Sequence, residues 1–410
     1  MSRIALVGEG PLPGPGSVDT SFAQLRLAQF FTALRVDHDV HVVDARTDDV
    51  ALALRDLRPG AVVSAGIFGP TRAAVAAAGA QPLCIDLPGD PFADAQMVAA
   101  FGGAEDIARE ARAVFVPALL RGDAFTTIAG PSRHALVGQL GLLGRLARTP
   151  PGDEWAFVTP VAWDFPGLRE APPRAPGAPV RVALVGGFNT WFDGETLLAG
   201  LLHAMDRVPV EVVVVGGPIP GHHTETWSTF AAGARTSPHG GRFKFHERLP
   251  PSELARVLAG CTVGVTLDRP GYEPELGSRT RLLLYLHQGL PVIATAQCEL
   301  ARDLAAGGWL AAVPPGDVVA LSDALVAPSA PLPDRGPLRA RYSVATTTAG
   351  LRAWAARPTR RAVHGDADAM AALSHERDTL RETLAQVYAS PTWRAMDRLR
   401  RLGGRSKTSN

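Results

Sequence analysis

The sequence predicts an α/β protein with two parallel-sheet domains facing across a cleft, followed by a helical C-terminal extension. Three observations support this fold class. Short β-branched runs alternate with amphipathic or alanine-rich stretches, which is typical of parallel sheets covered by helices. After the proline-rich residues 166–179, the strand and glycine turn of residues 3–8 return at residues 180–189. Residues 366–389 differ from both halves, because they are polar with apolar positions at heptad spacing.

Composition narrows the class of protein. The chain has 410 residues, of which 46% are apolar and 20% charged, as in globular proteins with a large core. A net charge of +1 gives no general attraction to nucleic acid. Three scattered cysteines predict reduced thiols, and neither a secretory signal nor an apolar run of about 18 residues is present. We therefore expect a cytoplasmic protein. His222 and His223 lack further ligands at metal spacing, so we expect no metal site.

The first domain is expected over residues 1–165. Its buried strands are predicted at residues 3–8, 40–45, 61–66, 82–90, 113–117 and 125–130, and residues 155–166 close the domain. Helices are predicted after the first strand, with Asp19 or Thr20 as the N-cap, and at residues 47–57, 70–79 and 131–147. The glycine loop that begins at Gly8 is one residue too long for a dinucleotide fingerprint and contains three prolines. We expect it to be a flexible acceptor-side loop carrying Gly14 and Gly16.

The second domain is expected over residues 180–335, after a linker at residues 166–179. Strands are predicted at residues 180–189, 210–217, 242–245, 262–266 and 291–295, and residues 309–317 end the run. Helices are predicted at residues 196–205, 282–288 and 317–327. In such sheets ligands bind outside the carboxyl ends of the strands, so the cleft between the two domains is the predicted site.

The C-terminal part changes character. Residues 336–356 predict a helix that packs back on the body, and residues 357–410 predict a helical extension with a basic tail. Heptad positions are occupied by Met370, Leu373, Leu380, Leu384 and Val387, with Arg377 in one slot. Either a coiled coil or an exposed docking helix fits this pattern. The tail at 390–410 carries six basic residues and one acid, with apolar residues between them. It suits an anionic membrane surface, and the alternative is a solvated tail.

The stretch 262–295 concentrates the chemistry. Five polar residues precede a predicted helix within nine positions, namely Glu273, Glu275, Arg279, Thr280 and Arg281. Free amides at a helix start, with arginines beside them, suit a phosphate or diphosphate. The alternative is that at least one arginine forms a structural ion pair with a neighbouring glutamate.

Residues 277–295 and 187–201 resemble the GT-B glycosyltransferases, in particular the retaining, nucleotide-sugar-dependent group that includes glycosyltransferase family 4. The resemblance covers roughly residues 1–330. It implies two Rossmann-like domains, a donor on the second, an acceptor on the first, and catalysis without metal. Two departures stand out. The second glutamate of the family's pair falls on Leu284 and the first near Leu276, beside Glu275. The family's basic pair after Gly187 is replaced by Asn189 and Thr190.

These observations give a set of candidate site residues. Asp90 and Glu275 are the expected catalytic residues. The expected diphosphate and donor site contains Gly186, Gly187, Asn189, Gly277, Ser278, Arg279, Thr280 and Arg281. His246 and Arg248 are expected at the base pocket, and Gly14, Gly16, Asp86 and His134 on the acceptor side. Turn-capping roles for the two aspartates and a plain surface position for His134 are the alternatives.

The predicted function is transfer of a sugar from a nucleoside-diphosphate sugar, which is a co-substrate and not a cofactor, to a glycan or lipid-linked acceptor. Bacterial cell-surface polysaccharide or glycoconjugate synthesis, at the inner membrane face, is the expected setting. The alternatives are a nucleotide-sugar 2-epimerase of the GT-B type and a non-catalytic nucleotide-sugar-binding or scaffold protein. Residues 390–410 are the expected contact with an anionic membrane.

Overall fold

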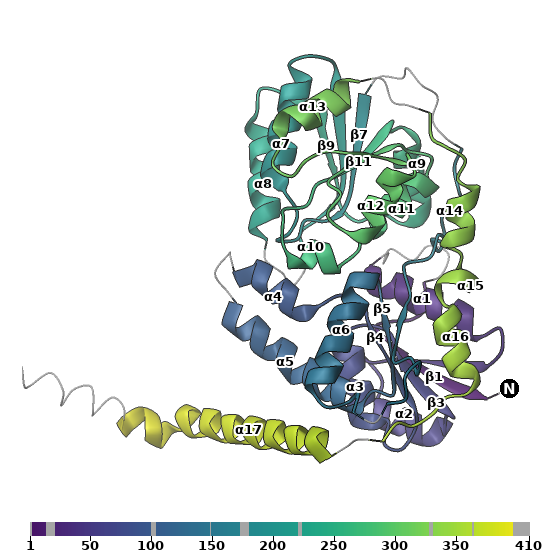
Figure 1. The fold of residues 1–410 in the computed structure, drawn as a ribbon. Helices are drawn as coiled ribbons and strands as arrows, with labels where there is room; N and C mark the ends of the chain where they lie inside the picture. The colour runs from purple at the N-terminus through teal and green to yellow at the C-terminus, as the bar shows by residue number, and fades with distance from the viewer. Residues whose placement is uncertain are drawn as a thin grey trace, which may run out of the picture.

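The computed structural model describes residues 2–13, 21–99, 104–147, 149–172, 180–219, 224–327, 331–362 and 365–396. They form two α/β domains, each built on a six-stranded parallel sheet, with a helical C-terminal segment (Figure 1). The fold class predicted from the sequence is confirmed. Most predicted strands lie within one or two residues of their observed bounds, because the buried runs are short and clearly separated.

The first sheet has the strand order β2-β1-β3-β4-β5-β6. Its strands are β1 (Arg3–Gly8), β2 (Asp39–Asp44), β3 (Ala61–Ser64), β4 (Leu83–Leu87), β5 (Ala124–Thr127) and β6 (Ala156–Val158). Its helices are α1 (Phe22–Leu34), α2 (Val50–Leu57), α3 (Gly69–Ala77), α4 (Pro91–Ala99), α5 (Ala104–Arg121) and α6 (Gly130–Leu142). Alternate residues of β1 enter different cores, since Ile4 packs with Phe30 on one face and Ala5 with Leu54 on the other.

The second sheet has the order β12-β11-β10-β7-β8-β9. Its strands are β7 (Val180–Gly187), β8 (Val210–Gly217), β9 (Phe243–His246), β10 (Val263–Thr266), β11 (Val292–Ala294) and β12 (Leu310–Ala312). Its helices are α7 (Gly194–Met205), α8 (Glu225–Thr236), α9 (Pro251–Ala259), α10 (Tyr272–Leu276), α11 (Thr280–His287), α12 (Glu299–Ala306) and α13 (Val318–Val326). The chain reverses its direction of growth between β7 and β10, so the switch point of the sheet lies there.

A buried tyrosine holds this switch point open. Strand β7 pairs with β8 over eight residues but with β10 at only two positions. Further along, the amide of Val185 donates to the hydroxyl of Tyr285 at 2.8 Å, and this hydroxyl donates to the carbonyl of Val265 at 3.4 Å. A Cβ on Gly264 would lie 2.3 Å from the tyrosine ring, so glycine makes room for it. The inserted hydroxyl satisfies the amide that the ladder leaves unpaired.

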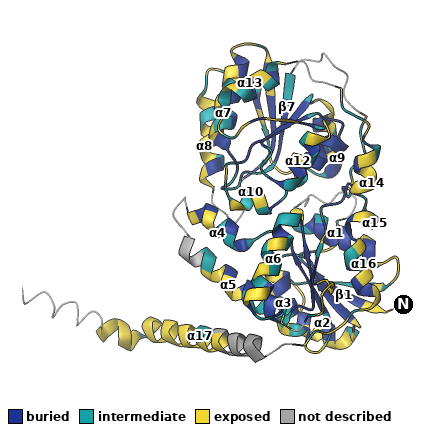
Figure 2. Cartoon of the chain, in the orientation of Figure 1, coloured by how far each residue is buried: buried dark blue, intermediate teal, exposed yellow. Residues whose placement is uncertain are grey.

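The C-terminal segment returns to the first domain. The single helix expected over 336–356 is three short helices, α14 (Gly336–Arg341), α15 (Val344–Thr347) and α16 (Ala349–Ala356). The Ser343 side chain caps α15, and this break lets the chain turn before α16. Leu351 and Trp354 of α16 then join the core around Ile4. Beyond residue 362, α17 (Gly365–Ala389) extends away from the body, and the side chains described on it are mostly exposed (Figure 2).

Two local predictions are corrected. Residues 113–117 are not a strand but part of α5. Residues Ala111, Val114, Phe115, Ala118 and Leu119 are buried at helical spacing, a period that the short apolar run did not reveal. The N-cap of α1 is Ser21, which accepts from the amide of Gln24, whereas Asp19 and Thr20 lie outside the described residues. In the part of the chain that the structure describes, no helix has both the length and the apolar character needed to cross a bilayer.

Candidate functional site

The loops after β7 and β10 meet at the switch point of the second sheet, where α11 begins. Gly186 has a φ of 105°, a left-handed conformation that favours glycine. A Cβ at this position would lie 3.4 Å from the Cζ atom of Arg281. Nη2 of Arg281 donates to the carbonyl oxygen of Gly187 at 2.9 Å. The glycine turn therefore allows the guanidinium to lie directly against the backbone at this edge of the sheet.

Arg281 is partly buried at the start of α11. Burial lowers the pKa of its guanidinium, partly offset by the charges of Tyr285 and Asp268. Its Cζ atom lies 5.5 Å from the centre of the Phe192 ring. No carboxylate among the described residues lies within 4.0 Å of it. A desolvated cation that lacks a paired acid is expected to attract an anionic ligand.

Polar atoms with unmet hydrogen bonds lie in the loop after β7 and at the end of β10. Oδ1 of Asn189 and Oγ1 of Thr190, in the loop after β7, are buried and have no partner among the described residues. The same holds for Oγ1 of Thr266, at the end of β10. Leaving a buried polar group unsatisfied costs about 1–3 kcal/mol, and such groups are often explained by a bound ligand or water. A hydroxyl or amide here can bind the oxygens or hydroxyls of a ligand.

Arg279 has a different environment. Its Nε atom donates to Oδ2 of Asp268 at 2.7 Å, and Nη2 donates to Oε2 of Glu273 at 2.6 Å. Burial opposes its charge, but the two carboxylates hold the pKa of Arg279 above its ordinary value. This geometry is the structural ion pair that the sequence left open, and it includes Asp268, which we did not predict. Arg279 shapes the loop that leads into α11.

The loop before α11 lies at the boundary between the domains. Helix α10 packs against α4 and α6 of the first domain. Glu275, on α10, is exposed. Thr280 is the first residue of α11, and Gly277 lies where a Cβ would be 3.0 Å from Oε1 of Glu273. The arrangement brings residues of the predicted donor site close to the first domain.

Asp94 on α4 is a candidate that the sequence analysis missed. Its Oδ1 atom is buried and has no hydrogen-bond partner among the described residues. Burial raises the pKa of Asp94 to about 6. Burial also raises the pKa of Glu273, and the negative charge of Asp94, across the domain boundary, adds to this rise. Its position one helical turn after Asp90 was visible in the sequence, but its burial, on a helix that contacts both α5 and α10, was not.

The aspartates expected on the acceptor side make structural contacts. Asp86 is fully buried, pairs with Arg26 through Oδ2 at 3.0 Å, and accepts from Thr126 at 2.7 Å. Its carboxylate is therefore not exposed to an acceptor. Asp90 accepts through Oδ1 from the amides of Phe92 and Ala93, so it caps the start of α4. The contact of Asp90 matches the capping alternative, whereas Asp86 lies within β4 and forms a buried ion pair that we did not predict.

The remaining predicted site residues lie on elements other than the β7 and β10 loops at the switch point. His134 is exposed on α6, His246 ends β9 and is half-buried, and Arg248 is exposed. Gly14 and Gly16 lie outside the described residues. Across the ranges that the structure describes, no cluster of three His, Cys, Asp or Glu side chains is placed to hold a metal ion.

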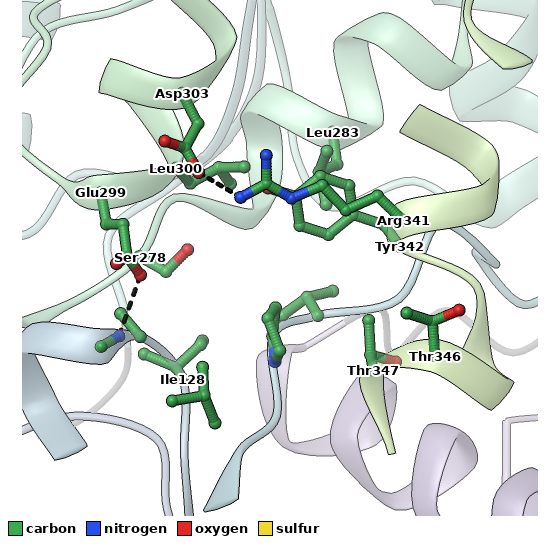
Figure 3. Close-up of a pocket in the computed structure, with 15 residues that line it drawn as sticks. Ile128, Ser278, Leu283, Glu299, Leu300, Asp303, Arg341, Tyr342, Thr346 and Thr347 are labelled. Carbon is green, nitrogen blue, oxygen red and sulfur yellow. Dashed lines mark hydrogen bonds and ion pairs between the residues drawn. The ribbon is translucent and has the colours of Figure 1, made fainter. Parts of the chain in front are cut away.

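A cavity of about 320 Å³ lies between the domains (Figure 3). Its lining comes from the end of β6, the loops after β5 and β6, α11, α12 and the α14–α15 segment. Of the predicted site residues, Ser278 lines it. Glu299 of the second domain accepts from the amide of Gly130, the first residue of α6, at 2.9 Å. Asp303, also on α12, pairs with Arg341 of α14. The Glu299–Gly130 hydrogen bond therefore joins the two domains beside this cavity.

No protein-family model matches the chain, and no curated protein sequence matches it. Solved structures are similar. Sucrose-phosphate synthase from Thermosynechococcus elongatus matches 93% of this chain and all of its own, with a TM-score of 0.55 and 16% identity. AviGT4, a glycosyltransferase involved in avilamycin A biosynthesis, matches 87% of this chain and 98% of its own, with a TM-score of 0.54 and 14% identity. A putative UDP-N-acetylglucosamine 2-epimerase from Listeria monocytogenes matches 88% of this chain and 98% of its own, with a TM-score of 0.50 and 12% identity.

These likenesses, together with the two six-stranded parallel sheets, define the class of fold. The chain has the GT-B fold that the sequence resemblance led us to expect.

Proposed function

We propose that this protein is a glycosyltransferase that moves a sugar from a nucleoside diphosphate to an acceptor. The observation that carries the proposal is the environment of Arg281. Its guanidinium is desolvated at the switch point, contacts the Gly186–Gly187 turn, and has no acid within ion-pair distance in the described chain. The GT-B fold also supports the proposal, since the similar structures include a glycosyltransferase.

The chemistry of glycosyl transfer suits this arrangement. When the bond between the sugar and the diphosphate breaks, the anomeric carbon becomes oxocarbenium-like and negative charge grows on the leaving group. A fixed cation in a low-dielectric site stabilises that charge without reorganisation. The amides at the start of α11 add a favourable dipole. Arg281 would hold the diphosphate, and Asn189 and Thr190 would supply neutral hydrogen bonds.

The acceptor would approach from the first domain. Glu275 on α10 and Asp94 on α4 lie on the two helices that meet at the domain boundary, so either carboxylate could contact an acceptor hydroxyl. We further propose a retaining reaction that needs no metal, in which the leaving phosphate takes the proton of the acceptor. This part rests on the resemblance of residues 277–295 to the retaining group.

Product analysis tests the proposal. A thermal-shift screen against UDP-, GDP-, dTDP- and CDP-sugars first identifies the ligand, because a bound ligand raises the melting temperature. The selected nucleotide sugar is then incubated with the protein and candidate glycan acceptors. We expect a glycosylated acceptor and free nucleoside diphosphate. Binding without turnover, in the presence of all acceptors tested, would instead favour a non-catalytic nucleotide-sugar-binding protein.

A 2-epimerase is the second candidate. Its fold is similar to that of the Listeria protein, and Asp94 places a carboxylate with a buried, unpaired oxygen and a raised pKa on a helix at the domain boundary. Such a group could remove and return a proton. Appearance of the C2 epimer of the nucleotide sugar, without acceptor, would favour the epimerase.

We extend the proposal to a glycan or lipid-linked acceptor at the inner membrane face, in the assembly of bacterial cell-surface polysaccharide or glycoconjugate. The support is the basic tail at residues 390–410, with six basic side chains and one acid. Trp393 and Met396 are exposed in the helical residues 391–396. Deleting residues 390–410 should reduce binding to anionic vesicles without lowering the melting temperature. Unchanged vesicle binding would contradict the membrane contact.

A further inference from the structure

Helix α17 carries an apolar stripe that the rest of the described chain leaves uncovered. Leu373, Leu380, Leu384 and Val387 are 60%, 56%, 50% and 41% exposed. Figure 1 shows the helix extending away from the first domain, and Figure 2 shows most of its described side chains exposed. A contiguous apolar surface on a soluble helix indicates a binding partner.

The spacing of this stripe defines a heptad register. Leu373, Leu380 and Val387 fall at d positions, and Arg377 and Leu384 fall at a positions. In this register Glu376 is a g residue and Arg381 is an e residue. In a parallel pair of helices, a g residue faces the e residue five positions further along the other helix. Two copies of α17 therefore place Glu376 of each helix opposite Arg381 of the other.

We propose that α17 pairs in parallel with α17 of a second copy of this chain, forming a two-stranded coiled coil. A second copy in this orientation is complementary in charge, because it gives two symmetric Glu376–Arg381 pairs. Arg377 is the single charged residue at an a position in this register, and one such polar residue selects register and oligomeric state at some cost in stability.

Charge argues against a membrane as the occupant of the stripe. Residues 365–389 contain five acids and two arginines, a net charge of −3 with histidine neutral. An anionic lipid surface would repel this helix. The basic residues of the tail begin at Arg394, after the stripe ends. A parallel pair gathers both basic tails at one end, so pairing of α17 and membrane contact by residues 390–410 are compatible and separable.

Sedimentation equilibrium of the full chain tests the pairing, at concentrations up to about 200 μM. We expect a dimer whose dissociation constant rises at least about 100-fold in the double variant Leu380→Glu/Leu384→Glu. Leu142→Glu is the matched control, since Leu142 is 87% exposed on α6, and it should leave the dimer unchanged. All three substituted side chains are exposed, so the melting temperature should not fall. A monomeric wild type, or a dimer that survives the double substitution, overturns the proposal.

Cysteine cross-linking tests the parallel orientation. Leu384→Cys should form a disulfide between the two copies on mild oxidation, because equivalent a residues approach closely. Glu382→Cys, on the outer face, should not. The three native cysteines are buried and do not compete. A dimer that gives no Leu384→Cys cross-link contradicts the parallel pairing.

Charge exchange tests the register. Arg381→Glu should weaken the dimer about tenfold, and adding Glu376→Arg should restore it, since the exchanged pair is again complementary. Failure of the second change to restore the dimer contradicts the register. A wild type that is monomeric but binds anionic vesicles through α17 would assign the stripe to the membrane and overturn the pairing.

Discussion

Nε of Arg279 donates to Oδ2 of Asp268 at 2.7 Å, while the same guanidinium binds Glu273 through Nη2 at 2.6 Å. The side chains are 6%, 3% and 13% exposed, so the network is buried. Removing the cation leaves two buried carboxylates without a counter-charge. We expect Arg279→Met to lower the free energy of unfolding of the second domain by about 3–5 kcal/mol in urea denaturation.

Arg256→Met is the control, because Arg256 is exposed on α9, and its effect should stay within about 0.5 kcal/mol. If Arg279→Met lowers the free energy of unfolding by less than about 1 kcal/mol, its ion pairs contribute no more than exposed surface ion pairs do. That result would contradict their structural role.

Tyr285 gives a second stability prediction. In Tyr285→Phe, the amide of Val185 loses the hydroxyl that it donates to, and β10 cannot approach to replace it. We expect a loss of about 1–3 kcal/mol in the free energy of unfolding, with faster amide hydrogen exchange at Val185. Tyr342→Phe is a suitable comparison, since no hydrogen bond is seen for that hydroxyl among the described residues. Unchanged exchange at Val185 would show that the inserted hydroxyl is dispensable.

Asp94 makes stability depend on pH. Burial raises its pKa to about 6 in the folded protein, against an ordinary value of 3.8, so the folded state binds this proton more tightly than the unfolded state. This contribution to stability is present below about pH 4 and is lost as the pH rises through about 6. Asp94→Asn should therefore stabilise the protein by about 1–3 kcal/mol at pH 7 and have little effect near pH 4.

Comparing the variant with the wild type isolates Asp94 from other titrating groups. Burial lowers the pKa of His287 to about 4, which favours the folded state at higher pH and opposes the effect of Asp94. His287 is present in both proteins, so its effect cancels in the difference. Denaturation at pH 4, 5, 6 and 7 gives that difference, and a constant value across the range would contradict a raised pKa for Asp94.

Local patterns in the sequence were sufficient for most of the fold. The strands β1 and β8 have the bounds that their apolar runs predicted, because a buried strand is flanked on both sides by polar residues and turns. The strand prediction for residues 113–117, which belong to α5, was wrong because five apolar residues fit either a strand or a helix. A single helix was predicted where the structure has the three short helices α14 to α16. The breaks between them depend on the Ser343 cap and on packing against the first domain.

The candidate site was only partly predictable for a related reason. Residues 273–281 predicted an anion site, but the sequence could not show which arginine already forms ion pairs with carboxylates of the protein. Asp268, which binds Arg279, precedes the acidic loop and looks like an ordinary turn residue. Asp94 lies on a helix of the other domain that contacts α10, and its charge acts on Glu273. Contacts between distant segments decide these roles, and no spacing rule encodes them.

The account depends most on the assignment of Arg281 to a diphosphate. Isothermal titration of the wild type and Arg281→Ala, with the nucleoside diphosphate chosen by the thermal-shift screen and with its nucleoside, tests this directly. Arg256→Ala is the control for loss of an exposed arginine. We expect Arg281→Ala to weaken diphosphate binding about 10- to 100-fold and to leave nucleoside binding unchanged. Equal weakening of both ligands, or no diphosphate binding by the wild type, would contradict the account.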